Sequence, residues 1–565
     1  MKNFKSLLLI ILIIAISATA LVSCAAGKNS DKNKNENDDQ KTASTYDISS
    51  FRIIRPYSAS GEVITLTSAI KKTIVSKTGA DLPVGIDIDF TESGSEILVG
   101  NTDRPESQAL LDEVKSKTSK EAFAIKVLEN KIVIVGISND DTLIAVNYFI
   151  DEIVSNADDG KKALSLENGD VIMKKTGKVF YKSQDLLTIF VEEERSDAYI
   201  PPDPSYNEAC TFGKIIKLEH QPDEKNNGIL IASKENNAYE SKAKDLKYPI
   251  LRSTDDGKTW KEIHRLVDHV NPGSTLGYQP YLFELPEDIG SFKKGTILFA
   301  SCTRTPATTM VIQYSTDLGE SWKGLCNVEQ GGLYNQGGWS SEGLWEPVLQ
   351  YENGRLYCFY SDELENGEGE NHVGGHNQRL VYRYTTDMKT WSDKKEMVAL
   401  EEPDARPGMI ALTKMGNGKW ALAYEGCGMG YNSCAIHIKF ADTLDSWDAA
   451  DRGTLIKNPA GSTMGSSPAI AWTPAGGECG TLFVTASYST NSKTKCDLFL
   501  SFDYGKTFVS INNPINLSFK GDHKLYGGYS PGMYVDKEGK LYYVNNPQYT
   551  VLWQEKLEFL RVKVY

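Results

Sequence analysis

The order of apolar and polar residues divides the chain into four stretches. A continuous apolar run covers 7–18, and a stretch from 28 to 44 has almost no apolar residue. In residues 46 to about 175, segments whose apolar residues recur every three or four positions alternate with short continuous apolar runs, which predicts helices alternating with strands. From about 178 onward, short strand-like runs alternate with turn residues to the end of the chain. The two folding regions therefore differ in architecture.

The first folding region, 46–176, is predicted to be a small α+β domain. Its apolar runs predict strands at 51–55, 96–100, 123–127 and 131–135. Helices are predicted where apolar residues recur at helical spacing, around 63–74 and 143–153, and Ser138 with Asp141 is a start signal for the second helix. With Ile97-Leu-Val-Gly-Asn-Thr102 as the most similar string, this region resembles the accessory N-terminal domain of bacterial α-glucuronidases and β-hexosaminidases.

The second region carries an internal repeat. Ser253-Thr-Asp-Asp-Gly-Lys-Thr-Trp260 recurs as 315–322 and 501–508, and two degraded copies lie at 385–391 and 442–447. The central Asp residues are 62, 70, 55 and 61 residues apart. In each copy the Asp, the turn residue and the aromatic ring are suited to a tight hairpin, and a strand-like run precedes four of the copies. A period of this size over the 388 residues from 178 to 565 predicts about six blades, that is, an all-β six-bladed β-propeller over 177–565.

The repeated motif resembles the Asp box of sialidases and related propeller glycosidases. That resemblance implies that the copies lie at outer hairpins, away from any catalytic face. We therefore expect these Asp and Trp residues to hold the blades together and to touch no substrate.

The N-terminus is predicted to be an export signal. Lys2 and Lys5 precede the apolar run, which is too short to span a membrane, and Leu21-Val-Ser-Cys24 follows it. These four residues resemble the lipobox of bacterial lipoproteins, which implies a signal peptide over 1–24 and a lipid on Cys24; the alternative is an ordinary signal peptide cut nearby. The polar stretch 25–45 cannot bury enough apolar surface to fold and is predicted to be a tether. The expected location is thus the cell surface, with the lipid anchor as the sole contact with the membrane.

Composition narrows the classes of partner. The net charge is −14 and the calculated pI is about 5.2, which argues against nucleic acid as a partner. The sequence has no CxxC pair, so we expect no zinc site. We also expect no cofactor, and we expect the protein to be a monomer. Spacing alone does not decide whether Cys427 and Cys434 form a disulfide or remain free thiols.

Two acidic residues stand in apolar, aromatic surroundings. Glu346 lies between Trp345 and Pro347 at the start of a strand, and Glu425 ends an apolar strand that opens into a glycine-rich loop. Burial can raise the pKa of such a carboxyl group, and glycoside cleavage usually needs one protonated and one ionised carboxyl group. The two residues are 79 positions apart, which places them in consecutive blades.

Six short strings around these acids resemble glycoside hydrolase family 93 in order and spacing: Trp345-Glu346-Pro347, Tyr360-Ser-Asp362, His376-Asn-Gln378, Asp404-Ala-Arg406-Pro-Gly-Met409, Tyr424-Glu425 and Gly465-Ser-Ser467-Pro468. The family comprises six-bladed exo-α-1,5-L-arabinanases that release arabinobiose with retention of configuration. The resemblance implies Glu425 as nucleophile, Glu346 as acid/base and a tyrosine, here Tyr529 or else Tyr526, in the site. Candidates for binding an oligosaccharide or polysaccharide are Trp345, Tyr360, Asp362, His376, Gln378, Arg406, Tyr424 and Ser467.

Structural roles stand beside these functional ones. Glu346 could cap a turn or pair with Arg406, Glu425 could be a loop acid, and Asp362 adjoins an acidic run that reaches Glu370. Aromatic residues such as Trp345 and Tyr360 more often pack than bind sugars.

Two other functions remain open on the sequence. A sialidase would need three arginines for the substrate carboxylate, but the first-blade Arg-Ile-Pro signature is replaced by Phe212-Gly-Lys214. A surface glycan-binding propeller without activity is the second alternative, which the presence of both Glu346 and Glu425 disfavours.

Overall fold

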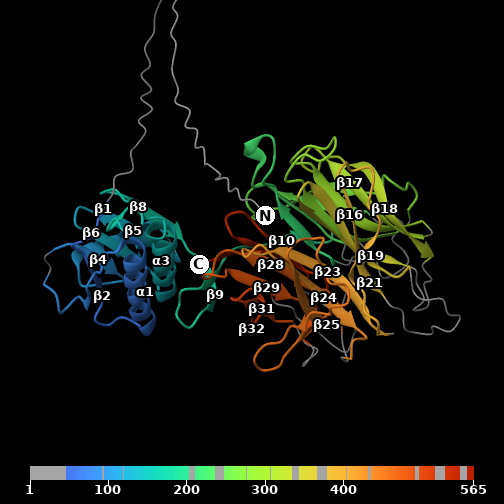
Figure 1. Cartoon of the computed structure of the whole chain (residues 1–565). Helices are drawn as coiled ribbons and strands as arrows, with labels where there is room; N and C mark the ends of the chain where they lie inside the picture. The colour runs from blue at the N-terminus through green and yellow to red at the C-terminus, as the bar shows by residue number, and fades with distance from the viewer. Residues whose placement is uncertain are drawn as a thin grey trace, which may run out of the picture. The chain divides into compact units, whose positions relative to one another are not determined.

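The computed structural model describes residues 46–565 apart from 92–93, 119, 203–209, 236–246, 275, 306, 334–342, 365–377, 403, 431–433, 490–495, 516–527 and 548–555 (Figure 1). The predicted signal peptide, the tether and Cys24 lie outside the described residues, as do His376 and Tyr526. Within the described residues, no helix is both long and apolar enough to span a bilayer.

The N-terminal region forms a mixed six-stranded sheet in the order β3-β2-β4-β6-β5-β8. Strands β3, β2, β4 and β6 are parallel, whereas β5 is antiparallel to both β6 and β8. The bounds are β2 (Arg52–Arg55), β3 (Val84–Ile86), β4 (Glu96–Val99), β5 (Ala122–Leu128), β6 (Lys131–Gly136) and β8 (Val171–Lys175). A separate ladder pairs β1 (Tyr46–Asp47) with β7 (Ala163–Leu164). All four predicted strands are present.

Helices cover both faces of this sheet. Helix α1 (Gly61–Thr78) and helix α3 (Asn139–Tyr148), which continues into the π-helical turn η1 (Phe149–Val154), share one apolar core with the sheet. The capping box of Ser138 and Asp141 starts α3 as predicted. Helix α2 (Pro105–Lys117) packs on the opposite face. The sequence did not predict α2 because it buries a narrow apolar stripe, Leu110, Leu111 and Val114, after a proline at its first position.

The C-terminal region is a six-bladed β-propeller, as predicted. Blade 1 consists of β11 (Lys214–Lys217), β12 (Leu230–Ser233), β13 (Tyr248–Ser253) and β14 (Lys261–Leu266), with the turn η2 (Glu224–Asn226). Blade 2 consists of β15 (Leu276–Glu284), β16 (Ile297–Thr305), β17 (Ala307–Ser315) and β18 (Lys323–Leu333). Blade 3 consists of β19 (Leu344–Glu352), β20 (Arg355–Asp362), β21 (Arg379–Thr385) and β22 (Lys395–Val398).

Blade 4 consists of β23 (Arg406–Lys414), β24 (Trp420–Cys427) and β25 (Ala435–Ala441), extended by β26 (Thr454–Leu455), β27 (Met464–Gly465) and β30 (Tyr488–Ser489). Blade 5 consists of β28 (Ala469–Thr473), β29 (Thr481–Thr485), β31 (Leu498–Ser501) and β32 (Val509–Ile511). Blade 6 consists of β33 (Gly532–Val535), β34 (Leu541–Asn545), β35 (Leu557–Val564) and β10 (Ile189–Tyr199), with β9 (Lys178–Lys182) at its edge. The first strand of each blade contacts the first strands of its two neighbours, so these six strands surround the axis.

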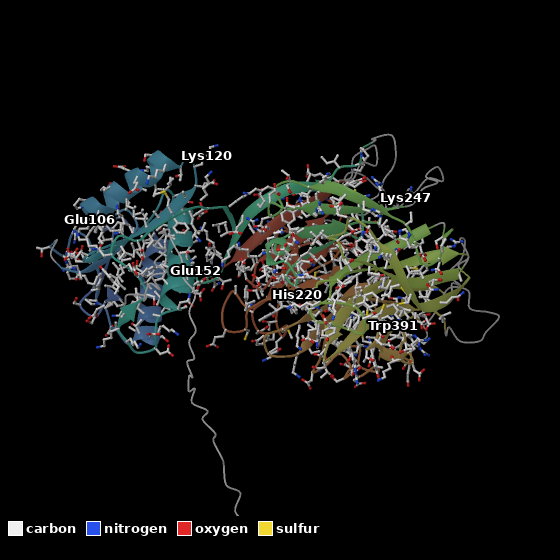
Figure 2. The ribbon with its side chains drawn as sticks, turned by 90° about the horizontal axis from the view of Figure 1, so that it is seen from above. Glu106, Lys120, Glu152, His220, Lys247 and Trp391 are labelled. Atoms are coloured by element: carbon white, nitrogen blue, oxygen red, sulfur yellow. A yellow bond between two sulfur atoms is a disulfide. The ribbon has the colours of Figure 1, made fainter. Side chains whose placement is uncertain are left out.

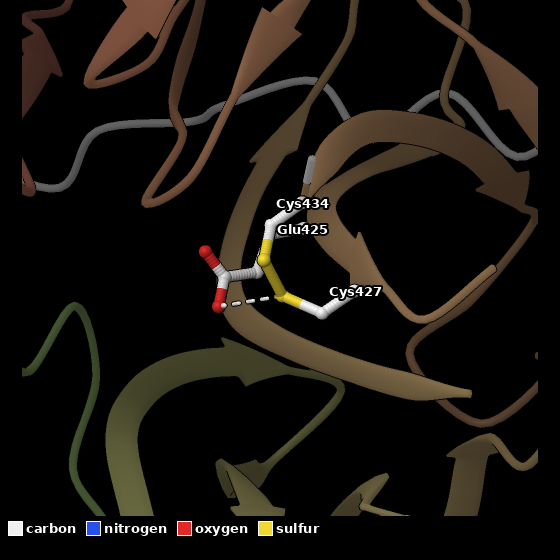
Figure 3. A group of neighbouring side chains, drawn as sticks. All are labelled: Glu425, Cys427 and Cys434. Atoms are coloured by element: carbon white, nitrogen blue, oxygen red, sulfur yellow. Dashed lines mark hydrogen bonds between the residues drawn. A yellow bond between two sulfur atoms is a disulfide. The ribbon is translucent and has the colours of Figure 1, made fainter. Parts of the chain in front are cut away.

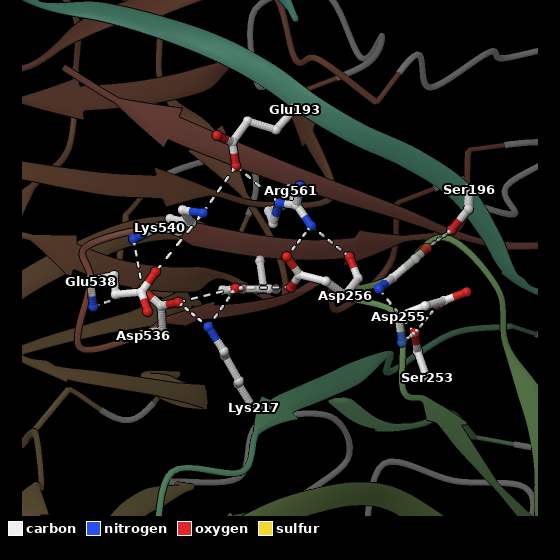
Figure 4. A network of polar contacts seen from close by, with 12 residues as sticks. Glu193, Ser196, Lys217, Ser253, Asp255, Asp256, Asp536, Glu538, Lys540 and Arg561 are labelled. Carbon is white, nitrogen blue, oxygen red and sulfur yellow. Dashed lines mark hydrogen bonds and ion pairs between the residues drawn. The ribbon is translucent and has the colours of Figure 1, made fainter. Parts of the chain in front are cut away.

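The ring closes between blade 6 and blade 1. Strand β10, which precedes blade 1 in the sequence, pairs with β35 of blade 6. An ion network then crosses to blade 1: Lys217 Nζ lies 2.6 Å from Asp536 Oδ2, and Arg561 donates to the carbonyl oxygen of Asp256 at 2.7 Å (Figure 4). Glu193 of β10 accepts from Arg561 at 3.0 Å. Because breaking one partner of a buried ion pair is costly, this network fixes the closure.

The Asp boxes form the outer hairpins. Four copies connect the third and fourth strands of their blades, and in the first copy Asp255 accepts from the backbone N–H of Thr259 at 2.9 Å and from its hydroxyl at 2.6 Å. Trp260 Nε1 donates back to the carbonyl oxygen of Gly257 at 3.2 Å. Trp391, which is labelled in Figure 2, ends the copy that is one residue short. Its Nε1 lies 3.4 Å from Cys326 Sγ of the neighbouring blade. The predicted structural role is consistent with this geometry.

Candidate active site

One turn of the backbone recurs where the innermost strand of each blade begins. In every blade a residue other than glycine has a positive φ at this point: Phe212 (53°), Gln279 (54°), Glu346 (58°), Met409 (57°), Ser466 and Ser467 (61° and 43°) and Ser530 (55°). Such residues are uncommon and gather at functional sites. We call these seven residues the axial girdle. Four of them, Gln279, Glu346, Ser467 and Ser530, directly precede a proline.

Hydrogen bonds link the girdle from one blade to the next. Glu346 N donates to Gln279 Oε1 at 3.0 Å, and Met409 N donates to Glu346 Oε2 at 3.0 Å. Met409 has a thioether side chain, which offers no comparable acceptor to the next blade. Glu425, which pairs with Gly408 across the ladder, takes that place and accepts from Ser467 N at 3.0 Å. Further links run from Ser530 N to Ser467 Oγ at 2.9 Å and from Phe212 N to Tyr529 O at 3.3 Å. Both predicted catalytic acids are therefore part of the blade-to-blade contacts.

Glu346 lies on the first strand of blade 3 and lines a small axial pocket with Lys214, Gln279 and Met409. Besides Met409 N, its Oε2 accepts from Ser361 Oγ at 2.6 Å, while its Oε1 is 3.5 Å from Gln279 Nε2. Burial raises the pKa of Glu346 to about 7, with a further contribution from the negative charge of Glu425, although the hydrogen bonds from Ser361 and Met409 oppose the rise. At neutral pH the protonated form of this carboxyl group is therefore populated.

Glu425 lies on the second strand of blade 4 and is 7% exposed. Burial raises the pKa of Glu425, while hydrogen bonds from Ser467 and Ser466 and the charge of Arg406 oppose the rise. Cys427 and Cys434 form a disulfide beside it, and Cys427 Sγ lies 3.7 Å from Glu425 Oε1 (Figure 3). Because both sulfur atoms are in the disulfide, the three side chains do not offer the thiolates that a metal ion would need.

A single strand, β23, brings the two carboxyl groups together. Its Met409 binds Glu346 through the backbone, and the adjoining Gly408 pairs with Glu425. A Cβ atom on Gly408 would lie 3.4 Å from Glu425 Oε1, so glycine leaves room for that side chain. Burial raises the pKa of both carboxyl groups, and the negative charge of Glu425 adds to the rise at Glu346. An acid and a nucleophile need such an unequal pair of environments.

Arg406 is the cation that acts on both acids. It favours the charged form of Glu346 and of Glu425, and it donates to Glu363 Oε1 at 2.6 Å. Glu363 Oε2 accepts in turn from Trp345 Nε1 at 3.0 Å. Glu363 therefore holds a cation and an aromatic ring beside the acids, whereas the sequence analysis had singled out its neighbour Asp362.

Three predicted substrate-binding residues point away from the acids. Tyr360 and Tyr424 are fully buried in cores between blades, where their hydroxyl groups contact Glu329 at 3.4 Å and the carbonyl oxygen of Arg452 at 2.6 Å. Strand alternation explains this, because each tyrosine adjoins a residue that faces the site. Asp362 is paired with Lys394 at 2.7 Å. This geometry favours packing roles for the two tyrosines and favours Glu363 over Asp362 as the site acid.

The remaining candidates lie at the girdle. Gln378 is 2% exposed and donates to the carbonyl oxygen of Pro407 at 2.8 Å, next to Gly408. Ser467 holds Glu425 through its backbone and also contacts Ser487 through its hydroxyl group. Tyr529 precedes Ser530, and its ring packs edge-on against Phe212 with centroids 5.4 Å apart. Their roles toward a substrate stay predictions.

The girdle itself was missed by the sequence reasoning. A polar residue followed by proline recurs at 279, 346, 467 and 530, a period close to that of the Asp boxes. That second repeat is the signal that identifies the start of the innermost strands.

Solved structures similar to this chain include glycoside hydrolases. The α-L-arabinanase of Penicillium chrysogenum, solved with arabinobiose, is 28% identical over 66% of this chain and 98% of that chain, with a TM-score of 0.54. The family 93 α-L-arabinofuranosidase of Fusarium graminearum, also solved with arabinobiose, is 23% identical over 66% of this chain and 97% of that chain, with the same TM-score. No family model and no curated protein matches the chain.

These comparisons confirm the resemblance of the propeller to glycoside hydrolase family 93. The arabinanase, at 28% identity, supports glycosidase activity. The Trypanosoma rangeli sialidase matches with a TM-score of 0.39, which adds no argument for its chemistry. The two alignments cover 66% of this chain. The resemblance of the N-terminal region to accessory domains stays a prediction.

Proposed function

We propose that this protein is a retaining exo-glycosidase that acts on α-L-arabinan. The observation that carries the proposal is the buried pair Glu346 and Glu425 at the axis, held by one strand, with the charge of Glu425 raising the pKa of Glu346. The likeness to an arabinanase solved with arabinobiose supports this choice of substrate.

In the proposed first step, Glu425 attacks the anomeric carbon while Glu346 gives its proton to the leaving oxygen. Each carboxylate has one oxygen engaged in the girdle, since Oε2 of Glu346 binds Met409 N and Oε2 of Glu425 binds Ser467 N. We therefore assign the proton transfer and the attack to the two Oε1 atoms. In the second step, Glu346 takes a proton from water, which then releases the sugar from Glu425.

A neutral sugar fits the charges of the propeller better than an anionic one. Six arginines of the propeller that could serve a sialidase-like grip form ion pairs with carboxylates in the described structure, namely Arg252, Arg265, Arg355, Arg379, Arg383 and Arg406. Arg406 alone among these six is coupled to both site acids. A sialidase-type site of three arginines gains no support from this arrangement.

The test is hydrolysis of linear α-1,5-arabinan by the purified protein, with the products separated by chromatography and the anomeric configuration followed by NMR. We expect arabinobiose with retained configuration and no release from a sialoside. Activity on the sialoside alone would replace arabinan with sialic acid as the substrate. Binding of arabinan without turnover by a correctly folded protein would favour the non-catalytic alternative.

We also propose that Cys24 carries a lipid that holds the protein at the bacterial surface. The lipobox-like sequence and the polar tether after it support this proposal. Expression of the full chain and of Cys24→Ala, followed by separation of membranes, tests it. The native chain should sediment with membranes and the variant should not; equal distributions would exclude the anchor.

A further inference from the structure

Gln279 contacts Glu346 twice from the preceding blade. Its Oε1 accepts the backbone N–H of Glu346 at 3.0 Å, and its Nε2 lies 3.5 Å from Glu346 Oε1. Gln279 is itself held in the left-handed region, with φ of 54°, by the bulge of β15 and the proline that follows it. The two contacts place the amide group of Gln279 against the carboxyl group of Glu346.

The chemistry of an amide suits these two contacts. One end accepts a hydrogen bond and the other donates one, so a single planar group can serve the N–H of Glu346 and the oxygen of its side chain. Oε1 of Glu346 is the oxygen that the girdle leaves available, because Oε2 already accepts from Ser361 and Met409. Leucine at 279 would remove both contacts, and glutamate would replace the donor with a negative charge.

We propose that Gln279 is a positioning residue for Glu346, which holds its backbone in the left-handed turn and donates to Oε1 once that oxygen has given up its proton. This inference rests on the proposed role of Glu346 as the acid/base. During the first step the proton leaves Oε1 for the glycosidic oxygen, and the negative charge that remains strengthens the hydrogen bond from Nε2. The same bond is weakened when Oε1 takes a proton from water in the second step.

The expected consequence is a shift of the pH profile. A donor to the charged form lowers the pKa of a carboxyl group, so its removal raises the pKa of Glu346. Because the acid must be protonated to act, the basic limb of kcat/KM should move to higher pH by about 0.5 to 1 unit in Gln279→Leu. We expect kcat to fall by about 10-fold to 100-fold, with KM changed much less.

The experiment measures kcat and KM on an aryl α-L-arabinobioside from pH 4 to 9 for the native protein, Gln279→Leu and Gln279→Glu. Gln350→Leu is the matched control, since Gln350 lies on the same strand as Glu346 but contacts Tyr281 at 3.5 Å. The basic limb should move up in both Gln279 variants and stay in place in the control. Should Gln279→Leu fail to fold, the isosteric Gln279→Glu still decides the question.

A basic limb that stays in place in the Gln279 variants would overturn the inference, whatever happens to their stability. Glu346→Gln, measured in parallel, separates this failure from failure of the proposed function. If Glu346→Gln is inactive and the limb does not move, Glu346 stays a member of the catalytic pair and the positioning role of Gln279 falls. If Glu346→Gln keeps native activity, the proposed function itself is wrong.

Discussion

The rim and the axis of the propeller both place carboxylates at left-handed turns, yet they shift the pKa in opposite directions. At the rim, hydrogen bonds from the side chain and then the backbone of Thr259 lower the pKa of Asp255 to about 2. At the axis, burial raises the pKa of Glu346 to about 7 even though two hydrogen bonds stabilise its charge. Access to solvent therefore decides the result, because both carboxylates have hydrogen-bond donors.

The partners of these carboxylates also differ in sequence distance. Asp255 binds groups four residues away within its own hairpin, so each Asp box can form by itself. Glu346 binds Met409, which is 63 residues away on the next blade. The axial acids thus acquire their environment when the blades assemble, and the rim acids acquire theirs when a hairpin closes. This difference predicts that rim and axis can be damaged separately.

The largest effect is expected from Glu425→Gln. Removal of the nucleophile should lower kcat/KM by about 10³-fold or more, because the covalent step no longer has its attacking group. The amide oxygen can still accept from Ser467 N, so the melting temperature should change little. Asp255→Asn is the matched rim control, and steady-state kinetics with thermal denaturation should show native activity in that variant. Near-native turnover by Glu425→Gln would remove it from the pair.

The pH profile of the native protein should report the two environments. The acid must be protonated, so activity should fall as pH rises through about 7, the pKa of Glu346. The nucleophile must be ionised, so activity should also fall as pH drops through the pKa of Glu425, which burial places above its ordinary value. Rates of kcat/KM across pH measure both limbs. A profile that is flat through pH 7 to 9 would contradict the assignment of Glu346.

Loss of the disulfide beside Glu425 should lower both the free energy of unfolding and kcat. The bond joins cysteines seven residues apart, and opening such a loop should cost about 2–3 kcal/mol of the free energy of unfolding. Since Cys427 Sγ contacts Glu425 Oε1 at 3.7 Å, we expect the Cys427→Ser, Cys434→Ser double variant to lose about tenfold in kcat. Urea denaturation and kinetics test both, with Cys479→Ser, a free cysteine, as the control. An unchanged rate would show that the disulfide does not position Glu425.

Gly257→Ala should damage the rim alone. Gly257 has φ of 90°, and an added Cβ atom would lie 2.0 Å from Phe559 Cε1 in the neighbouring blade. We expect the free energy of unfolding to fall by about 1–3 kcal/mol, through overpacking and backbone strain. The rate per folded molecule should stay native because the axis is not touched. A loss of kcat in the folded fraction would mean that rim and axis are coupled.

The smallest effect is expected from Lys214→Met. Burial lowers the pKa of Lys214 to about 8, and among the described residues its ammonium group donates to the carbonyl oxygen of Pro531 at 3.4 Å. Replacing this buried cation should be neutral or stabilise the fold by about 1 kcal/mol at pH 7. An unfolded lysine keeps its proton to about pH 10.4, so the native protein should regain stability relative to the variant as pH rises from about 8 to that value. Denaturation of both proteins at pH 7 and pH 9.5 would detect the change. A marked loss of stability in Lys214→Met at pH 7 would contradict the prediction and show that Lys214 forms an ion pair that the fold needs.

The rim was predictable from the sequence because its contacts are local. Each Asp box contains its own donors and acceptors within eight residues, so the repeat alone predicted the hairpins, the blades and the ring. Helix α2 was not predicted, because its short apolar stripe has too few members to establish a helical period.

The axis was predictable only in part. Glu346 and Glu425 stood out as acids in apolar sequence, and the structure brings both to one strand. Strand alternation alone would have turned Tyr360 and Tyr424 away from the site, a rule that the sequence reasoning did not apply to them. The pairing of Glu363 with Arg406 and that of Gln279 with Glu346 cross between segments 43 and 67 residues apart, so no local pattern reveals them.

The central claim is that Glu425 attacks the sugar while Glu346 supplies the proton. A 2-deoxy-2-fluoro-α-L-arabinofuranosyl probe with a good leaving group should trap the covalent intermediate, and mass spectrometry of the digested protein locates the label. We predict a single adduct on the peptide that carries Glu425, absent from Glu425→Gln. A label on Tyr529 would point to a sialidase-type nucleophile, and a label on Glu346 would reverse the roles; either result would contradict the mechanism described for this site.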